Sequence, residues 1–425
     1  MKLTTRLDNI HHQHQKIRDQ EASFFGFKKY LASISQAEYE QNVVNLVIEI
    51  DHKLKEGNKG LDGSNVKKRV QKLFFEVVPS LKSEDARASI QELVAKNKGL
   101  QNYLDSELRN CRKAKVKSPH LIHDPHHTLS RKIAKARFAL KLGLGTEAAG
   151  TGLSGSEFVR GINGKRLGLF KVTMDKTNMT KWLNDCVLPY FWSNQPYYLK
   201  SGPKAGVEAE EAAYVVSSSA GFGRLVPPTM VMSFNDVVGS FQLMAKKEIG
   251  DNITEFENII DEFEQRESYK SEEVNLFQNF AVYDYLINNL DRHHGNWIVE
   301  YTNVDGEVEL KRIHAIDHDR AFSVENPGGS SRGSKNQYKW KSLKIAGEEI
   351  TSETKRFIQQ NLQVNQIEGV IEQVMQNVPG FLTDSMKKQI YQKAAVLWKI
   401  ANEGGTFKEL GGLGNDDAIQ SYLAP

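Results

Sequence analysis

Two neighbouring stretches organise this sequence: LINNLDRHHGNWIVEY (residues 286–301) and, after a short hairpin sequence, IHAIDHDRAF (residues 313–322). They present Asp291, Asn296 and Asp317, each beside an apolar helix or strand pattern. In ATP-dependent phosphoryl transfer, a carboxylate and an amide hold a metal ion on the phosphates, and a second carboxylate orients the acceptor hydroxyl and takes its proton. The pattern therefore favours such a site, with Asp291 as the base and Asn296 and Asp317 as metal ligands. A polar turn with structural salt bridges is the alternative interpretation.

The composition is that of a globular protein with more than one domain. Of its 425 residues, 39% are hydrophobic and 26% are charged, which favours two or three domains. The 56 basic and 53 acidic residues leave a net charge of +3, which gives no sign of a nucleic-acid partner. Two cysteines make no disulfide framework, no apolar run reaches membrane-spanning length, and the N-terminal segment lacks a signal-peptide core. We therefore expect a cytoplasmic protein that meets membranes only peripherally.

Residues 1–130 are predicted to form an all-helical accessory domain that ends in a basic linker. Apolar residues recur at helical spacing over residues 43–54, and a further helix is expected to begin at Ser83, whose hydroxyl can cap it. The linker carries four histidines, at positions 120, 123, 126 and 127. We interpret them as solvated, because neither cysteines nor an acidic cluster accompany them to form a metal site.

Residues 131–248 alternate short apolar runs with glycine turns, which predicts the strands of a small lobe. The segment SGSEFVRGINGKRLGLFKV (residues 154–172) contains a Gly-Ser turn, a strand, an Asn-Gly turn and a second strand that ends at Lys171. Backbone N–H groups of a glycine-rich turn can approach phosphates, and a lysine can supply charge to them. A surface hairpin with a solvated lysine is the alternative, but the apolar run before Lys171 favours partial burial.

The next elements are expected to support Lys171 and to deliver the two aspartates. A helix over EAEEAAYVV (residues 208–216) offers a glutamate that can pair with Lys171, and GSFQLMAKK (residues 239–247) is predicted to be a strand and a hinge. Residues 249–425 are predicted to form a helical large lobe. Within it, a helix with one apolar face leads to Asp291, and a hairpin that turns at Asp305-Gly306 leads to Asp317.

Several motifs occur in the order that is typical of the phosphatidylinositol 3/4-kinase superfamily. They lie between about residues 150 and 400 and read SGSEFV, LGLFK, AAYVV with GFGRLVPPT, GSFQL, DRHHGNW, AIDHDRAF and YKWKS. Within that superfamily, the chain resembles the type II phosphatidylinositol 4-kinases. The resemblance implies an α+β, bilobal, protein-kinase-like fold, with ATP in the cleft between a strand-rich small lobe and a helical large lobe.

The resemblance also implies a role for individual residues. Lys171 would contact the ATP phosphates with Glu210 as its helix partner, and Ser154, Gly155 and Ser156 would form the phosphate-covering turn. Asp291 would be the catalytic aspartate, and Asn296 and Asp317 would bind Mg²⁺, with Mn²⁺ as an alternative.

The sequence departs from the family pattern at two places. His318-Asp319 follow the metal-binding aspartate where the family usually has Asn-Gly, which adds a charge beside that carboxylate. Only Cys186 stands where the type II enzymes carry a cysteine-rich palmitoylation stretch, and a single acyl chain anchors weakly.

The implied function is transfer of the γ-phosphate of ATP to the inositol ring of phosphatidylinositol, in the manner of a 4-kinase. DRHH also resembles the catalytic loop of secretory-pathway protein kinases, so a protein Ser/Thr kinase with the same atypical fold is the alternative. A binding module that has lost catalysis is a third hypothesis. The presence of Lys171, Asp291, Asn296 and Asp317 argues against it.

Basic and aromatic residues after Asp317 predict a surface that meets an anionic membrane. The cations are Arg320, Arg332, Lys335, Lys339 and Lys341, interleaved with Tyr338 and Trp340. Cations can pair with lipid phosphates while aromatic rings lie at the headgroup level. We expect this patch to share a face with the aromatic-rich insertion at residues 182–198. The alternatives are a solvated basic loop and, for the insertion, a local core.

Overall fold

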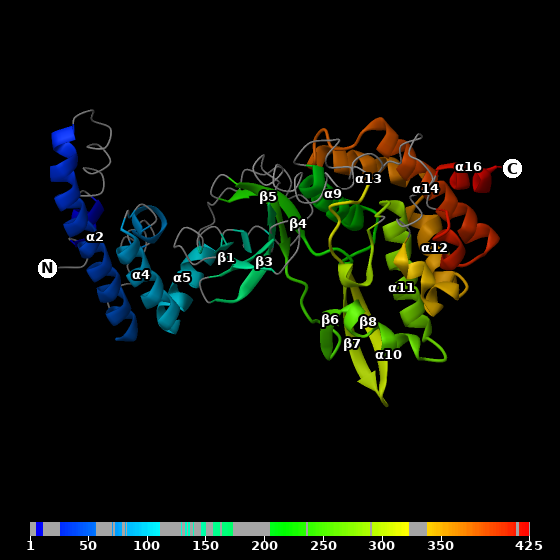
Figure 1. Cartoon of the computed structure of the whole chain (residues 1–425), viewed down its shortest axis with the longest axis horizontal. Coiled ribbons are helices and arrows are strands. Elements are labelled where there is room, and N and C mark those ends of the chain that lie inside the picture. The colour runs from blue at the N-terminus through cyan, green and yellow to red at the C-terminus, as the bar shows by residue number, and fades with distance from the viewer. Residues whose placement is uncertain are drawn as a thin grey trace, which may run out of the picture. The chain divides into compact units, whose positions relative to one another are not determined.

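The computed structural model describes the chain at residues 6–11, 26–56, 70, 73–78, 81, 83–110, 129, 132–133, 135–136, 139, 146–149, 156–161, 164–172, 205–234, 237–289, 291–322, 338–413 and 416–424. The chain divides into two compact units (Figure 1). The first covers Met1–Ser118, His126–Thr151 and Glu157–Gly168. The second covers Pro119–Pro125, Gly152–Ser156 and Leu169–Pro425.

The first unit contains the predicted N-terminal helices around a hydrophobic core of their own. The helices are α2 (Gly26–Lys55), α4 (Glu84–Lys96) and α5 (Lys98–Asn110), with the short π-helical turn η1 (Leu73–Val77). Val43, Leu46 and Ile50, which the periodicity placed on one face, are buried in this core. The predicted cap is confirmed, because the Ser83 hydroxyl accepts the Ala86 N–H at 3.2 Å and begins α4.

Five strands form one sheet in the order β1-β2-β3-β5-β4. They are β1 (Thr146–Ala148), β2 (Glu157–Arg160), β3 (Arg166–Val172), β4 (Thr229–Phe234) and β5 (Val237–Leu243), of which β4 and β5 form an antiparallel pair. A Cβ at Gly239 on β5 would lie 2.3 Å from the Lys171 carbonyl oxygen and 2.6 Å from the Phe170 ring. Glycine at position 239 therefore permits β5 to lie close to β3, the strand that carries Lys171.

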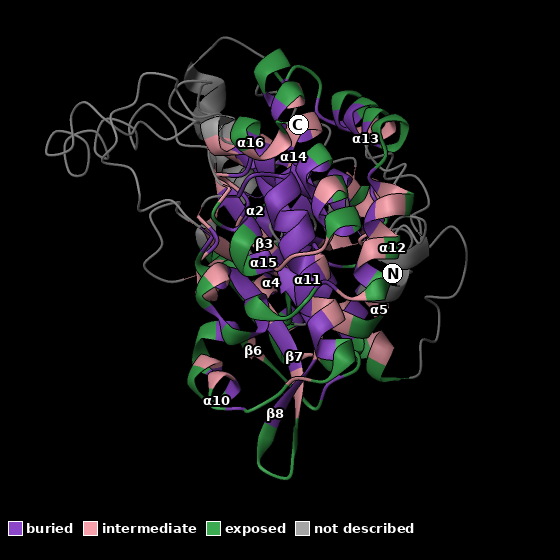
Figure 2. Ribbon diagram, turned by 90° about the vertical axis from the view of Figure 1, so that its right-hand side faces the viewer, coloured by how far each residue is buried: buried purple, intermediate pink, exposed green. Residues whose placement is uncertain are grey.

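A second, three-stranded antiparallel sheet has the order β6-β7-β8, with β6 at Asn252–Glu255, β7 at Trp297–Val304 and β8 at Glu307–Ala315. The predicted hairpin is present: Asp305 and Gly306 both have positive φ, +52° and +87°, as a tight β-hairpin turn requires. Because β8 ends at Ala315, this hairpin delivers Asp317 directly after a strand. Its exposed tip is green in Figure 2.

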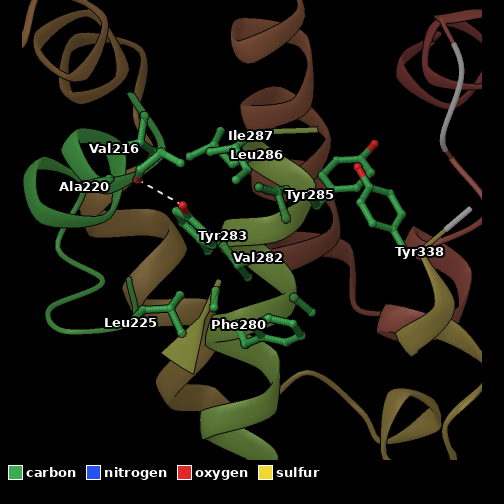
Figure 3. Packing of buried hydrophobic residues seen from close by; sticks show 14 of the residues in the cluster. Val216, Ala220, Leu225, Phe280, Val282, Tyr283, Tyr285, Leu286, Ile287 and Tyr338 are labelled. Carbon is green, nitrogen blue, oxygen red and sulfur yellow. Dashed lines mark hydrogen bonds between the residues drawn. The ribbon is translucent and has the colours of Figure 1, made fainter. Parts of the chain in front are cut away.

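Helix α11 (Ser271–Leu286) is buried on most of its surface and lies at the centre of the second unit's core (Figure 2). It contacts α12 (Ser352–Asn361) and α14 (Asp384–Glu403), while α13 (Val364–Asn377) packs against α9 (Ala205–Ser219). The Tyr283 hydroxyl donates to the Ala213 carbonyl of α9 at 3.0 Å, and Tyr285 lies near Tyr338 (Figure 3). A helix that is apolar on most faces is expected in such a position.

Short helices complete the second unit: η6 (Phe256–Asn258), α10 (Ile260–Glu264), η7 (His294–Asn296), η8 (Lys339–Ser342), η9 (Lys344–Gly347), α15 (Phe407–Leu410) and α16 (Asp416–Leu423). The predicted α+β class is confirmed at the level of helices combined with two antiparallel sheets. The kinase-like, bilobal arrangement and the division at residues 130 and 248 stay predictions. Of the helices in the described ranges, none combines the length and apolar character needed to cross a membrane.

Candidate active site

Lys171 is a buried cation held between two carboxylates from different elements. Its Nζ pairs with Glu210 Oε1 of α9 and donates to Asp317 Oδ1, which follows β8, at 2.6 Å. Lys171 is 9% exposed and Glu210 is 1% exposed. Burial alone would lower the pKa of Lys171, but Asp317 and Glu210 more than offset this effect and raise that pKa above its ordinary value. The lysine is therefore charged throughout the physiological pH range.

The Glu210 carboxylate is held ionised from two sides. Burial would raise its pKa, but Lys171 and His318 keep that pKa well below the ordinary range. His318 Nδ1 lies 3.4 Å from Glu210 Oε2, and its ring is completely buried. Burial lowers the pKa of His318 to about 4, so this imidazole is neutral at pH 7. The histidine that departs from the family pattern therefore packs beneath the ion pair without adding charge.

Asp319, the other residue of the His318-Asp319 pair, carries less negative charge near neutral pH than an ordinary aspartate. Burial and the neighbouring Asp317 raise the pKa of Asp319 to about 7. The charge that we expected beside Asp317 is thus partly suppressed near neutral pH. Two adjacent carboxylates resist simultaneous ionisation, as like charges at one site do in general.

Asp291 and Asn296 lie in the loop between α11 and β7. The Asn296 side-chain amide donates to the Asp291 carbonyl at 3.0 Å, which fixes its nitrogen and leaves its oxygen as a potential ligand. The Asp291 carboxylate is 41% exposed and lies 3.3 Å from Arg320 Nη1. Solvent can therefore reach the Asp291 carboxylate, whereas Asn296 is buried, with 5% of its surface exposed.

Hydrogen bonds join the loops that carry Asn296 and Asp317. The Ile316 N–H donates to the Asn296 carbonyl at 3.0 Å, and the Asn289 side chain donates to the Asp317 carbonyl at 3.1 Å. Asp317 has a φ of +59°, which non-glycine residues rarely adopt. Such strain occurs often at functional sites, where the surrounding structure holds it in place.

These residues fit a magnesium ion shared with a nucleotide. Mg²⁺ prefers oxygen ligands and is held by one or two carboxylates together with substrate phosphates and water, so a complete protein cage is not required. Within the described part of the chain, no group of three or more His, Cys, Asp or Glu side chains forms such a cage. Asp317 and the Asn296 amide oxygen supply the two kinds of oxygen that this mode of binding needs.

Several predicted residues lie outside the described ranges. These are Ser154 and Gly155 of the phosphate-covering turn, Arg332 and Lys335 of the basic loop, and the linker histidines and the aromatic insertion with Cys186. Ser156 is described and directly precedes β2.

The prediction that Tyr338 and Trp340 form a membrane-facing pair is wrong. Both side chains are 0% exposed, and their rings stack with centroids 4.9 Å apart. The Tyr338 hydroxyl donates to Asn288 Oδ1 at 3.1 Å, and the Trp340 N–H donates to Asp284 Oδ2 at 3.0 Å. The sequence suggested amphipathic surface residues, but interior acceptors satisfy both polar groups. Lys339 between them is exposed.

A buried ion pair that was not predicted from the sequence lies close to these loops. Arg292 and Asp284 are each 0–1% exposed and form an ion pair with Nε and Oδ1 3.0 Å apart. A signal was present, because Asp284 interrupts the apolar run FAVYDYL of α11. A carboxylate within a buried helical face needs a buried partner.

The comparisons with known proteins point to one group of kinases. Phosphatidylinositol 4-kinase type 2-beta of Rattus norvegicus is 24% identical over 295 residues, which cover 55% of this chain and 59% of that protein. The Gallus gallus type 2-beta enzyme is 25% identical over 254 residues, covering 46% and 51%. The Danio rerio type 2-alpha enzyme is 24% identical over 358 residues, covering 71% and 79%. The chain is a distant homologue of the type II phosphatidylinositol 4-kinases.

This homology confirms the resemblance that the motifs indicated, although no family model matches the chain. The matched regions span only 59% and 51% of the lengths of the rat and chicken relatives. Among solved structures, the Helicobacter pylori proinflammatory kinase CtkA matches over 66% of this chain and 96% of its own, with 11% identity and a TM-score of 0.28. A TM-score this low carries no argument about the fold.

Proposed function

We propose that this protein is an ATP-dependent kinase that phosphorylates the inositol ring of phosphatidylinositol. The observation that carries the proposal is the convergence of Lys171, Glu210 and Asp317 from β3, α9 and the segment after β8. A buried lysine that is held by a helix glutamate and faces a metal-binding aspartate is an arrangement that protein kinases use for phosphoryl transfer from ATP. Distant homology to the type II phosphatidylinositol 4-kinases supports the same chemistry.

Each residue has a defined part in this mechanism. Lys171 would steady the ATP phosphates. Asn296 and Asp317 would hold Mg²⁺, or Mn²⁺ in its place, and the ion would supply positive charge to the phosphates. Asp291 orients the acceptor hydroxyl and takes its proton. Because such transfer depends mainly on positioning and charge neutralisation, buried and rigid groups such as Lys171 and Glu210 suit it.

The acceptor assignment rests on the relatives and on the surroundings of Asp291. The matched relatives are phosphatidylinositol 4-kinases. Arg320 lies beside Asp291 with a side chain that is 42% exposed, and Lys339 adds an exposed cation in the segment before Trp340. An acceptor that carries a phosphodiester, on an anionic membrane surface, complements this charge.

A substrate panel tests the proposal. The 425-residue chain is given radiolabelled ATP and Mg²⁺ with phosphatidylinositol vesicles, with phosphatidylcholine vesicles, and with casein as a generic protein acceptor. We expect label in the inositol lipid alone, and deacylation followed by chromatography identifies the phosphorylated hydroxyl. Label in casein with none in the lipid would replace this proposal with a protein Ser/Thr kinase.

A further inference from the structure

Arg292 binds both loops that carry the proposed metal ligands. Its Nη1 donates to the carbonyl oxygen of Asn296 and to the carbonyl oxygen of Ile316, the residue before Asp317. A single nitrogen thus links the backbone carbonyl of Asn296 to the peptide group that precedes Asp317, and both residues are proposed metal ligands. Arg292 itself directly follows Asp291 in the chain, so its side chain links the segment that carries Asp291 and Asn296 to the residue before Asp317.

The guanidinium is fixed from its other side. Its Nε donates to Asp284 Oδ1 of α11 at 3.0 Å, and the second oxygen of Asp284 accepts the Trp340 N–H at 3.0 Å. Burial raises the pKa of Asp284, while Arg292 and Trp340 oppose that effect. The chain of contacts runs from η8 through α11 to the two loops, and every side chain in it is fully buried.

Two features separate this arrangement from an ordinary buried ion pair. Arg292 is 1% exposed and cannot contact ATP or an acceptor, so its charge does not act on substrate directly. Its hydrogen bonds go to backbone carbonyls on two different loops, which a planar guanidinium can bridge while a third donor binds Asp284. A lysine has a compact ammonium on a flexible stem and does not reproduce that geometry.

We propose that Arg292 is a positioning residue that sets the separation of Asn296 and Asp317, with Asp284 and Trp340 holding its guanidinium in place. This inference rests on the proposed kinase function, in which Asn296 and Asp317 bind the metal ion. Outer groups that orient metal ligands affect metal affinity by about 10- to 100-fold in other proteins. Arg292 acts in the same manner, but through the backbone of the ligand loops.

The test substitutes Arg292→Lys and uses Arg266→Lys as a matched control. Arg266 is also buried, pairs with a helix carboxylate (Glu273) at 2.7 Å and donates to a strand carbonyl (Val308) at 2.8 Å. Arg266→Lys therefore measures how much stability and Mn²⁺ affinity are lost when a buried, bridging arginine away from the proposed metal ligands is replaced. Electron paramagnetic resonance titration with Mn²⁺, in the presence of a non-hydrolysable ATP analogue, measures metal affinity independently of turnover. The Mg²⁺ dependence of phosphate transfer is measured alongside.

We expect Arg292→Lys to weaken Mn²⁺ binding by about tenfold or more and to raise the Mg²⁺ concentration needed for half-maximal transfer. Arg266→Lys should keep Mn²⁺ affinity within about twofold of wild type, although it loses comparable stability. Equal Mn²⁺ affinity in Arg292→Lys and Arg266→Lys would overturn the inference.

A milder variant covers the case in which Arg292→Lys does not fold. Trp340→Phe keeps an aromatic ring but removes the N–H that holds Asp284 and some buried volume, and it leaves Arg292 in place. We therefore expect a smaller loss of Mn²⁺ affinity in the same direction. Unchanged affinity in this variant would overturn the inference in that case. A wild-type protein that binds Mn²⁺ with the analogue, yet transfers no phosphate, would refute the kinase proposal while the binding titrations still decide the role of Arg292. Absence of wild-type Mn²⁺ binding would refute both.

Discussion

At the scale of single residues, the Lys171–Glu210 pair joins stability to the proposed chemistry. Lys171→Met should slow phosphate transfer by about 100-fold or more. It should also lower the free energy of unfolding by about 3–5 kcal/mol, because Glu210 is left buried without its main cation. Chemical denaturation and a transfer assay measure the two effects separately.

The double variant Lys171→Met/Glu210→Gln provides the control for that experiment. It removes both charges, so most of the lost stability should return while transfer remains slow. A double variant that is as unstable as Lys171→Met would show that the buried pair does not account for the stability effect.

Glu211, the neighbour of Glu210, gives a prediction about pH. Burial raises the pKa of Glu211 to about 8 from its ordinary value of 4.5, although the Val231 N–H that it accepts at 2.9 Å lowers this pKa. The like charge of nearby Glu208 adds to the effect of burial. The folded state then binds more protons than the unfolded state between these two values, so stability falls as the pH rises through this range. Relative to Glu211→Gln, the wild type should lose on the order of 2–4 kcal/mol between about pH 5 and pH 8. Chemical denaturation at several pH values measures the free energy of unfolding of both proteins. The same pH dependence in the two proteins would contradict this prediction.

Residue types at the site were predictable, but their surroundings were not. The spacing within DRHHGNW and IHAIDHD marks Asp291, Asn296 and Asp317 because each follows a locally encoded helix or strand. The Asp284–Trp340 hydrogen bond joins positions 56 residues apart, and no periodicity connects them. For the same reason, the sequence placed Tyr338 and Trp340 at the surface when long-range acceptors hold them inside.

At the scale of elements, the close approach of β5 to β3 positions Lys171. Gly239→Ala should cost on the order of 1–3 kcal/mol, because its Cβ meets the Lys171 carbonyl oxygen and the Phe170 ring. It should also weaken ATP binding, since relief of the clash moves the strand that carries Lys171. Urea denaturation and ATP titration check both effects.

Gly369→Ala on α13 is the matched control, because a Cβ there meets no atom within 4 Å. A glycine-to-alanine change at an open helical position should stabilise by about 0.4–1 kcal/mol and leave ATP binding unchanged. Equal effects at positions 239 and 369 would refute the packing argument for β5 and β3.

The elements themselves were largely predictable, whereas the contacts that hold the segment after β5 were not. Helices α9 and α11 and the β7–β8 hairpin follow from apolar periodicity and an Asp-Gly turn. Beyond β5, however, the segment at residues 248–250 donates three successive N–H groups to Glu300 Oε2, at 2.7, 2.7 and 3.2 Å. From the sequence, a glutamate within a strand pattern is expected at the surface, and only the tertiary structure shows that Glu300 is buried.

At the scale of the whole molecule, the proposed membrane contact depends on charge rather than on the aromatic pair. Lys339→Glu should reduce activity on anionic phosphatidylinositol vesicles by roughly five- to thirtyfold, since each cation near such a surface contributes on the order of 1 kcal/mol. Hydrolysis of ATP in solution should be unaffected. Added salt should reduce the difference between the variant and the wild type.

Arg356→Glu, an exposed position on α12, makes the same charge change away from that segment. It should leave vesicle activity near the wild-type level. If Arg356→Glu and Lys339→Glu reduce vesicle activity equally, net charge rather than a local surface controls membrane contact. Lys341 is a weaker test, because its side chain is only partly exposed.

The most direct test of the kinase assignment is single-turnover transfer of labelled phosphate from ATP to phosphatidylinositol by the wild type and by Asp317→Asn. Asn at this position keeps the size of the side chain but removes the charge that is proposed to hold the metal ion and that faces Lys171. We predict transfer by the wild type and a loss of about 100-fold or more in the variant, with a cooperative melting transition retained. Near-equal rates for the two proteins, or no transfer by the wild type to any acceptor, would contradict the assignment.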